Sequence, residues 1–434
     1  MFIIQPSTVI VLTKMLKIIT STNRRAMEGL LRGSSVRLAD AEVVARRILA
    51  GVRREGDRAL VRYAKKFDGL DLVASGFEVS RKEIEAAYQQ VPRGFFAALR
   101  VAARNIRSVA RRQLPRGWQT RTTPGVTVSQ IIRPLDRVVC YVPGGRFPLP
   151  STVLMSVIPA QVAGVKEIVI TSPRPAAAVL VTADFLGIKR IFRLGGAQAI
   201  AAFAFGTRRV PRTDKIVGPG NRFVAAAKKL IAGECGIDFV AGPSELVIAG
   251  ARGRAEWIAA DLIAQAEHDP DAVAILITPS RQLAVRVARA GMKILERLNL
   301  PVAEKALAGQ GAIIVTRDLA EAIELVNRFA PEHLTLLDDA AKHLDRIESA
   351  GSIFLGDYSA VAAGDYASGT NHILPTGGVA RLRGGLSAAD FVKVVTTQRL
   401  SRAGLAGLRK SITTLANTEG LKAHAYSVDT RFML

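Results

Sequence analysis

The 434-residue sequence has few of the residues that mark several protein classes. Its two cysteines, Cys140 and Cys235, are too few for a disulfide framework, and neither lies in a Cys-x-x-Cys metal motif. With 49% hydrophobic residues, 22% charged residues and 19 prolines, the composition excludes collagen-like, disordered and low-complexity chains. We therefore expect a globular protein of a reducing, cytoplasmic compartment, with both cysteines buried or half-buried.

Long apolar segments are also lacking. Residues 1–13 are mostly apolar, but polar residues and a proline interrupt them, and they have no basic start typical of a signal peptide. A membrane helix needs about 20 apolar residues, and no later stretch approaches that length. We expect no membrane segment. Met15 offers a second start besides Met1, which would make the first 14 residues an extension outside the fold.

Acidic residues are scarce relative to basic ones. Lys and Arg number 60 against 37 Asp and Glu, a net charge of +23, and no acidic residue lies between Ala86 and Gln130. Arginine rows can neutralise nucleic-acid phosphates, so a nucleic-acid-binding module is an alternative hypothesis of a different class. The arginines are spread over several expected helices without interleaved aromatic residues. This pattern favours a solvated face or pairing with another subunit.

The hydrophobic pattern predicts an α/β fold with two doubly wound domains. Residues 22–130 mostly carry the helical period, and the tail from Gly385 returns to helix without a strand signal. Between them, short β-branched runs that end in Gly, Pro or Ser turns alternate with Ala-rich amphipathic stretches. The expected strands begin near residues 138, 167, 190, 215 and 237, and then near 274, 312, 333 and 352.

The turns after these strands are the expected place for function, because ligands of doubly wound sheets bind outside the carboxyl ends of the strands. A G-x-G-x-x-G fingerprint is missing, and residues 195–198 and 218–221 are only fragments of one. The turns alone do not establish a nucleotide site.

Histidine is rare, and four of the five histidines lie near carboxylates or carboxamides in the sequence. These four are His268, His333, His372 and His424. The fifth, His343, lies in a charged helical stretch and is expected to face solvent.

Gln265 and His268 are three residues apart at the end of an amphipathic stretch, so on a helix they would face the same way. Zinc would need one or two further ligands, which Asp365 and His424 could supply. The alternative is an ordinary helix C-terminus, where the helix dipole favours His268 and Pro270 ends the helix.

Glu332 and His333 are adjacent at the start of an expected strand. A carboxylate beside an imidazole suits a reaction with two chemically different proton transfers, although an exposed turn pair is the alternative. Asp365 and Glu419 could likewise be simple loop and helix-cap carboxylates. Ser244 could cap a helix rather than contact a substrate.

Together these segments resemble the histidinol dehydrogenase family, from about residue 15 to the end of the chain. The resemblance rests on an ordered series of motifs: YVPGG at 141–145, GGAQA at 195–199, VGPGN at 217–221, AGPSE at 241–245, QAEH at 265–268, PEHL at 331–334, GDYASGTNH at 364–372 and EGLKAH at 419–424.

The resemblance implies a homodimer with shared active sites and one zinc ion in each. Gln265, His268, Asp365 and, from the C-terminal arm of the other chain, His424 would bind the metal. The implied substrate contacts are Ser244, His372 and Glu419, together with the metal ligands and His333. NAD would lie against Tyr141, Gln198 and Asn221.

The implied reaction oxidises L-histidinol to L-histidine with two NAD⁺ through an aldehyde held on the enzyme. His333 would accept the alcohol proton in the first half, and Glu332 would deprotonate the attacking water in the second. Residues 146–148 (Arg-Phe-Pro) replace the small residues usual in the family. Because an arginine suits an anionic group, a dehydrogenase of another polar alcohol, such as a sulfonated diol, is the alternative.

The resemblance also implies the domain boundaries. Residues 1–30 would form an N-terminal extension and 137–244 the Rossmann-like NAD-binding domain. Residues 31–136 would join 245–384 in a discontinuous α/β domain with the metal and catalytic residues. Residues 385–434 would form a helical arm that contributes to the active site of the other subunit.

Overall fold

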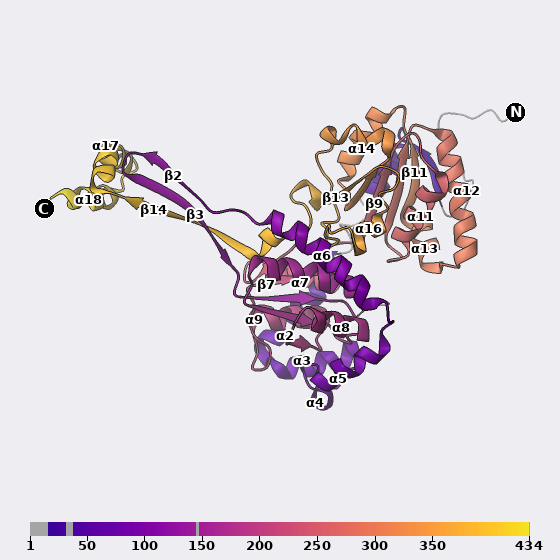
Figure 1. The fold of residues 1–434 in the computed structure, drawn as a ribbon, viewed down its shortest axis with the longest axis horizontal. Coiled ribbons are helices and arrows are strands. Elements are labelled where there is room, and N and C mark those ends of the chain that lie inside the picture. Colours follow the sequence, from indigo (N-terminus) through magenta and orange to yellow (C-terminus); the bar gives the residue numbers. More distant parts are fainter. Residues whose placement is uncertain (1–15, 32–37, 145–146, 434) are drawn as a thin grey trace.

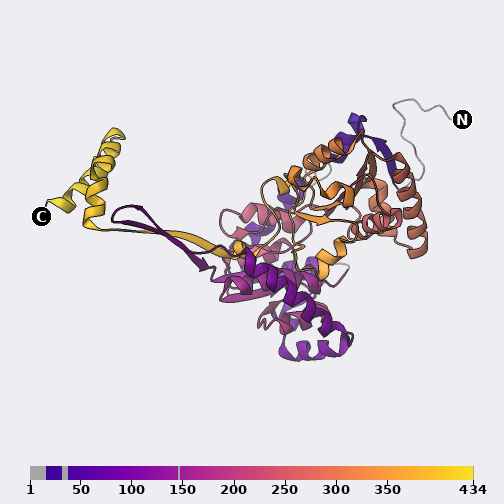
Figure 2. The same ribbon diagram turned by 45° about the horizontal axis from the view of Figure 1, so that its top comes forward.

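The computed structural model describes residues 16–31, 38–144 and 147–433. It has two α/β domains and an arm that extends away from both (Figure 1). The arm remains apart from the domains when the molecule is turned by 45° (Figure 2). Both domains contain a parallel sheet, which confirms the predicted fold class.

The first domain has a five-stranded parallel sheet in the order β6-β5-β4-β7-β8. The chain runs outward from central β4 to one edge and then returns to the other side, so the strand order reverses between β4 and β7. This is the doubly wound order, and each of the first five expected runs contributes a strand. The strands are β4 (Arg137–Tyr141), β5 (Glu167–Thr171), β6 (Ile191–Phe192), β7 (Lys215–Val217) and β8 (Gly236–Ile237).

Helices cover both faces of this sheet. Leu60 and Ile200 belong to the core on one face, and Leu99 and Ile158 to the core on the other. The helices are α2 (Leu38–Glu55), α3 (Asp57–Tyr63), the π-helix η1 (Ala64–Asp68), α4 (Leu72–Ser75), α5 (Arg81–Ala87), η2 (Tyr88–Gln90), α6 (Phe95–Gln113), α7 (Pro150–Ala163), α8 (Ala177–Phe185), α9 (Gly196–Phe205) and α10 (Arg222–Ile231).

The predicted grouping of residues 31–136 with 245–384 was wrong for the helices between residues 38 and 113. These helices share their hydrophobic cores with the sheet of residues 137–237. Their amphipathic pattern indicates that they cover a sheet, but it does not specify which one.

The second domain has a six-stranded parallel sheet in the order β1-β11-β10-β9-β12-β13. Its last five strands repeat the order of the first domain, with the reversal between β9 and β12. β1 extends the sheet at one edge, so residues 17–20 belong to this domain and not to a separate extension. The strands are β1 (Lys17–Thr20), β9 (Glu245–Ala249), β10 (Val273–Thr278), β11 (Gly311–Val315), β12 (His333–Leu336) and β13 (Ser352–Leu355).

The helices of the second domain also pack on both faces of their sheet. α12 shows the local reasons: Ser280 caps its first turn, its apolar stripe is buried, and Asn299 ends it in the left-handed conformation. The helices are α1 (Arg24–Leu31), α11 (Ala255–Ala266), α12 (Arg281–Leu298), α13 (Pro301–Gln310), α14 (Leu319–Phe329), α15 (Asp338–Ala341), η3 (Leu344–Arg346), α16 (Val361–Tyr366) and, in the segment that leads to the arm, η4 (Val379–Arg381) and η5 (Ala388–Phe391).

The arm combines a three-stranded antiparallel sheet, in the order β14-β3-β2, with two helices at its end. The expectation of a purely helical C-terminal extension was therefore wrong, as was the reading of 118–130 as helix. The elements are β2 (Trp118–Thr123), β3 (Val126–Pro134), β14 (Val392–Leu400), α17 (Arg402–Thr418), α18 (Lys422–Asp429) and η6 (Thr430–Phe432).

Two further expectations concern the core and membranes. Cys140 and Cys235 are both free and buried, as predicted. Among the described residues, no helix has the length and apolar character needed to cross a bilayer.

Candidate active site

A cavity of about 370 Å³ lies at the carboxyl edge of the first sheet. It is lined by the three residues predicted to contact NAD, Tyr141, Gln198 and Asn221. Tyr141 ends β4, Gln198 lies in the first turn of α9, and Asn221 caps α10. The cavity therefore lies where the strand order reverses, as expected for a doubly wound sheet.

Hydrogen bonds hold the walls of this cavity. The Tyr141 hydroxyl accepts a hydrogen bond from the Gly196 backbone N–H at 3.1 Å, and burial raises the pKa of this phenol to about 12. The Asn221 side-chain oxygen accepts hydrogen bonds from the backbone N–H groups of Phe223 and Val224, with N···O distances of 3.0 and 3.1 Å. The Asn221 carboxamide therefore caps the helix as well as lining the cavity.

The same cavity contains Asp68, which sequence reasoning missed. Gln198 Nε2 donates a hydrogen bond to Asp68 Oδ2 at 3.1 Å. Burial raises the pKa of Asp68, against the opposing effects of Gln198 and Arg174. Asp68 ends the π-helix far in the sequence from Tyr141, Gln198 and Asn221, so none of their motifs could have marked it.

The second candidate cluster lies at the amino edge of the second sheet. His333 begins β12, Glu332 precedes it, and Glu245 begins the neighbouring strand β9. Only 5% of Glu332 and 4% of His333 are exposed, so the exposed-turn alternative is excluded. Ser244 is followed by β9 and not by a helix, so it cannot be a helix N-cap.

Glu245 is a second residue that sequence reasoning passed over, because its backbone organises the catalytic pair. Its N–H donates to Glu332 Oε2 at 2.8 Å, and its carbonyl oxygen lies 3.1 Å from His333 Nδ1. The second contact is a hydrogen bond when Nδ1 carries the proton, which leaves Nε2 as the basic nitrogen of a neutral imidazole. Burial, reinforced by Glu332, raises the pKa of the Glu245 carboxyl to about 7.

His333 lies between two carboxylates. Nδ1 is 3.5 Å from Glu332 Oε2, and Nε2 is 3.6 Å from Asp365 Oδ1. Burial by itself lowers the pKa of His333, but Glu332 and then Asp365 outweigh it and raise the pKa to about 10. Nε2 is buried without a hydrogen-bond partner among the described residues, so it is free to meet a substrate.

Three predicted metal ligands lie at this same edge. Asp365 is at the end of α16, and Gln265 and His268 are at the end of α11. Burial by itself raises the pKa of Asp365, but His333, His372 and His268 together lower it. Gln265 is buried, and its Nε2 has no hydrogen-bond partner within the described part of the chain.

The two domains meet beside these residues. His372 Nδ1 lies 3.0 Å from the Asp365 carbonyl oxygen, and its Nε2 lies 3.4 Å from Thr152 Oγ1 in the first turn of α7. Asn371 also donates to the Met155 carbonyl oxygen at 2.7 Å. Because α7 starts at the carboxyl edge of the first sheet, that edge faces the amino edge of the second.

The predicted NAD-contact residues thus lie at the carboxyl ends of the strands, as expected, whereas the predicted catalytic and metal-binding residues of the second domain lie at the opposite, amino edge of its sheet. In the second domain, Glu332 and His333 lie at the start of a strand, and the candidate metal ligands lie in the last turn of a helix or just after it. The motif positions were informative, but the general rule points to the other edge of this sheet.

Comparison with known proteins resolves the family. A sequence profile described as histidinol dehydrogenase matches residues 32–432. This chain belongs to the histidinol dehydrogenase family. The match spans both domains and the arm, and it does not favour a nucleic-acid-binding module.

Named relatives of the histidinol dehydrogenase family agree. The chain is 47% identical to histidinol dehydrogenase from Methanothermobacter thermautotrophicus over 95% of this chain and 98% of the relative. It is 49% identical to histidinol dehydrogenase from Syntrophotalea carbinolica over 88% of this chain and 91% of that relative. The crystal structure of histidinol dehydrogenase from Elizabethkingia anophelis matches with a TM-score of 0.90 and 37% identity, and the match covers 96% of this chain and 98% of that one.

Two of the residues predicted from the histidinol dehydrogenase resemblance lie elsewhere in this chain. Glu419 and His424 are exposed on the two helices of the arm, which Figure 1 shows well away from the second domain. Within the described residues, no group of three or more His, Cys, Asp or Glu side chains is arranged to hold a metal ion. Arg146 lies outside the described residues.

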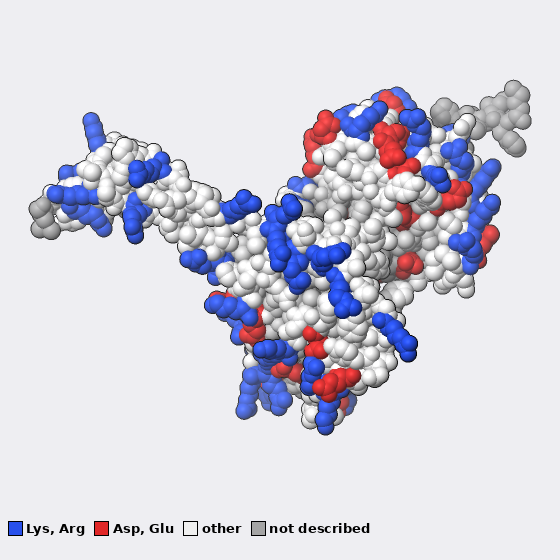
Figure 3. All heavy atoms as spheres, viewed as in Figure 1, with Lys and Arg blue, Asp and Glu red and all other residues white. Residues whose placement is uncertain are grey.

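The basic excess is most evident on α6. Figure 3 shows blue side chains gathered over this helix. Five arginines of α6 and one just after it line an open hollow: Arg100, Arg104, Arg107, Arg111, Arg112 and Arg116. This hollow is lined by none of the residues described above.

Proposed function

We propose that this chain oxidises L-histidinol to L-histidine, through L-histidinaldehyde, with NAD as the oxidant. The observation that carries this proposal is the buried Glu332–His333 pair, which lies at the domain junction opposite the cavity edge of the first sheet. Family membership supports the substrate, and the two adjacent proton acceptors suit a two-stage oxidation.

The cavity at the carboxyl edge of the first sheet is the candidate NAD site. Tyr141, Gln198 and Asn221 line it with polar groups among apolar residues such as Phe67 and Val44, a mixture typical of a cofactor pocket. NAD supplies the hydride acceptor for both oxidations. The carboxyl edge of the first sheet, where this pocket lies, faces the domain junction.

The donor set at the second sheet fits zinc. Gln265, His268 and Asp365 offer an amide oxygen, an imidazole nitrogen and a carboxylate. Because no described residue holds the buried Gln265 amide by a hydrogen bond at Nε2, the amide is free to turn its oxygen toward a cation. His424 of the partner subunit would be the fourth ligand. Zinc supplies a template that orients the imidazole and amino nitrogens of the substrate.

His333 serves the first oxidation. The Glu245 carbonyl oxygen fixes the ring through Nδ1. Nε2 then accepts the proton of the substrate hydroxyl while a hydride leaves the carbon that bears this hydroxyl. The neighbouring carboxylates Glu332 and Asp365 favour the protonated ring, which stabilises the form reached after proton transfer but would also keep the metal-free ring protonated beforehand. Asp365 loses part of this influence when it ligates a cation.

Glu332 serves the second oxidation. It is buried, and the Glu245 N–H holds one of its carboxylate oxygens. Glu332 deprotonates the water that attacks the aldehyde, and the resulting hydrate loses the second hydride. The two halves therefore use adjacent residues within one buried cluster, which retains the aldehyde between them.

The arm supports a homodimer in which each chain completes the site of the other. None of its residues enters a hydrophobic core among the described residues, and large apolar side chains remain exposed on it. A second chain would cover such an arm. The exposed residues are Trp118, Val394, Val395, Leu415, Leu421 and Tyr426.

Counting NADH tests the proposal. Zinc-loaded protein is incubated with limiting L-histidinol or with a limiting sulfonated diol, and NADH is measured at completion. We expect two NADH for each histidinol and little from the diol. A preference for the diol would favour the alternative that Arg146 suggests, and one NADH for each histidinol would refute the four-electron reaction.

A further inference from the structure

A buried ion pair lies beneath the candidate NAD cavity. Lys228 is 2% exposed and Asp238 4% exposed, and their charged groups are in contact. Lys228 lies in α10, and Asp238 directly follows β8. Neither residue lines the cavity or belongs to the sites described above.

Both members of the pair bind one residue, Gly218. Asp238 Oδ2 accepts the Gly218 N–H at 2.8 Å, and Lys228 Nζ donates to the Gly218 carbonyl oxygen at 3.1 Å. Asp238 Oδ1 also accepts the Phe239 N–H at 2.7 Å. The pair therefore holds both polar backbone groups of Gly218.

The backbone of Gly218 lies in a conformation and a place that only glycine can adopt here. Its φ of +118° is rare for any residue with a side chain, and a Cβ here would collide with the carbonyl oxygen of Tyr141. Gly218 thus lies between Tyr141, at the end of β4, and Asn221, the cap of α10. Both of these neighbours line the cavity, so the place of Gly218 sets their separation.

A second tie connects this pair to the base of the arm. Arg383 donates to the Asp238 carbonyl oxygen at 2.7 Å and forms an ion pair with Asp390 at 2.6 Å. Asp390 lies two residues before β14. The backbone below the cavity is thereby fixed to the segment that leads into the arm.

We propose that Lys228 and Asp238 are positioning residues for NAD, which act by clamping Gly218 and so setting the separation of Tyr141 and Asn221. A buried ion pair is seldom more stabilising than apolar side chains of similar size, so stability alone does not account for it. This inference rests on the proposed NAD site.

The test is the double variant Lys228→Met/Asp238→Asn, which leaves no unpaired buried charge. The variant loses the Lys228 bond to Gly218, and its single Asn oxygen can accept only one of the two N–H groups that Asp238 binds. The NADH dissociation constant and the KM for NAD should therefore rise at least about tenfold, which corresponds to the net value of one hydrogen bond. The KM for histidinol should change by less than about twofold, which is within the scatter of a neutral substitution. NADH binding is measured by fluorescence without histidinol.

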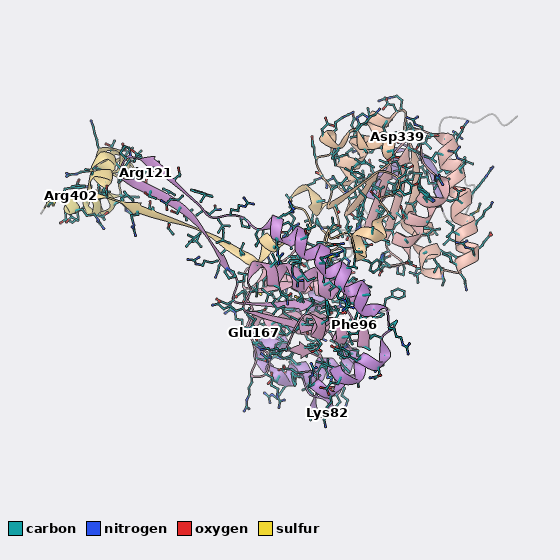
Figure 4. All side chains as sticks on the ribbon, in the orientation of Figure 1. Lys82, Phe96, Arg121, Glu167, Asp339 and Arg402 are labelled. Carbon is teal, nitrogen blue, oxygen red and sulfur yellow. The ribbon has the colours of Figure 1, made fainter. Side chains whose placement is uncertain are left out.

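The control is Arg137→Met/Glu167→Gln, which removes the partly exposed ion pairs of Glu167 with Arg137, at 2.5 Å, and with Arg190, at 3.2 Å, at the opposite edge of the same sheet. Figure 4 labels Glu167 in the first domain. This control should bind NADH as the wild type does. Equal weakening in both variants, or equal changes in the KM values for NAD and histidinol, would overturn the clamp.

Lys228→Arg is the second variant, and it keeps a positive charge beside Asp238. Its larger guanidinium must displace Gly218, so NADH binding should still weaken, by about threefold or more. Unchanged NADH binding in either folded variant overturns the clamp. If wild-type protein binds NADH but does not oxidise histidinol, the proposed function fails while the clamp is still tested.

Discussion

The first and second domains have the same strand order, yet their candidate sites lie at opposite edges of their sheets. In the first domain, Tyr141 ends a strand and Asn221 follows one, and both line a cavity. In the second, Glu332 precedes a strand and His333 begins it. The Thr152–His372 contact shows why: the two edges face each other at the domain junction. One sheet can therefore present the oxidant and the other the proton acceptors.

The comparison predicts that changes at the two edges affect different kinetic constants. The largest effect is expected for His333→Asn, which removes the proton acceptor of the first oxidation and should lower kcat by about 10²- to 10⁴-fold. Single-turnover NADH formation from histidinol is the measurement. A near-normal rate would remove His333 from the chemistry and break the division between the edges.

Glu332→Gln is expected to have the next largest effect, and mainly in the second half. Gln keeps an oxygen for the Glu245 N–H but cannot deprotonate water, so histidinaldehyde oxidation should fall about 10²-fold. The alcohol step should fall much less. Stopped-flow NADH formation from each substrate separates the halves, and equal losses would contradict the assigned roles.

At the first edge, Tyr141→Phe should produce a smaller effect of a different kind. It removes the hydroxyl that accepts the Gly196 N–H, a hydrogen bond worth about 1 kcal/mol, so the KM for NAD should rise about fivefold. Steady-state kinetics at saturating histidinol would show this with kcat little changed. A fall in kcat alone would mean that the first edge contributes to proton transfer.

The last effect is on stability and not on rate, and it concerns pH at the second edge. Because the pKa of Glu245 is raised from 4.5 to about 7, its contribution to stability is present below about pH 4.5 and is lost as the pH rises through 7. Metal-free Glu245→Gln should therefore lose less stability than wild type between pH 5 and pH 8, by roughly 1–3 kcal/mol. Urea unfolding at both pH values measures it, and parallel curves would exclude a charge effect.

Much of the fold follows from the sequence because buried parallel strands are short β-branched runs that end in turns. All nine expected strands of the two sheets occur. The arm strands were missed for a physical reason. Most residues of β14 are exposed on both faces, so the periodicity of a half-buried strand is absent, although its Val and Thr content was a usable signal.

The candidate site was predicted only where its motifs are local. Glu332, His333, Gln265 and His268 were marked by short motifs that resemble the histidinol dehydrogenase family, since their spacing alone left structural alternatives open. Asp68 is brought to its cavity by tertiary packing alone. The role of the Glu245 backbone is likewise invisible in a side-chain motif.

The central claim is that the two facing edges form one site that the arm of a second chain completes. Heterodimers of a His333→Asn chain and a His424→Ala chain, purified through two different tags, test it most directly. Exchange of arms would leave one intact site in each dimer, so about half of the wild-type NADH formation is expected. A wild-type chain paired with a chain that carries both substitutions should then be inactive. The reverse pattern, with an inactive first heterodimer and a half-active second, would contradict the account.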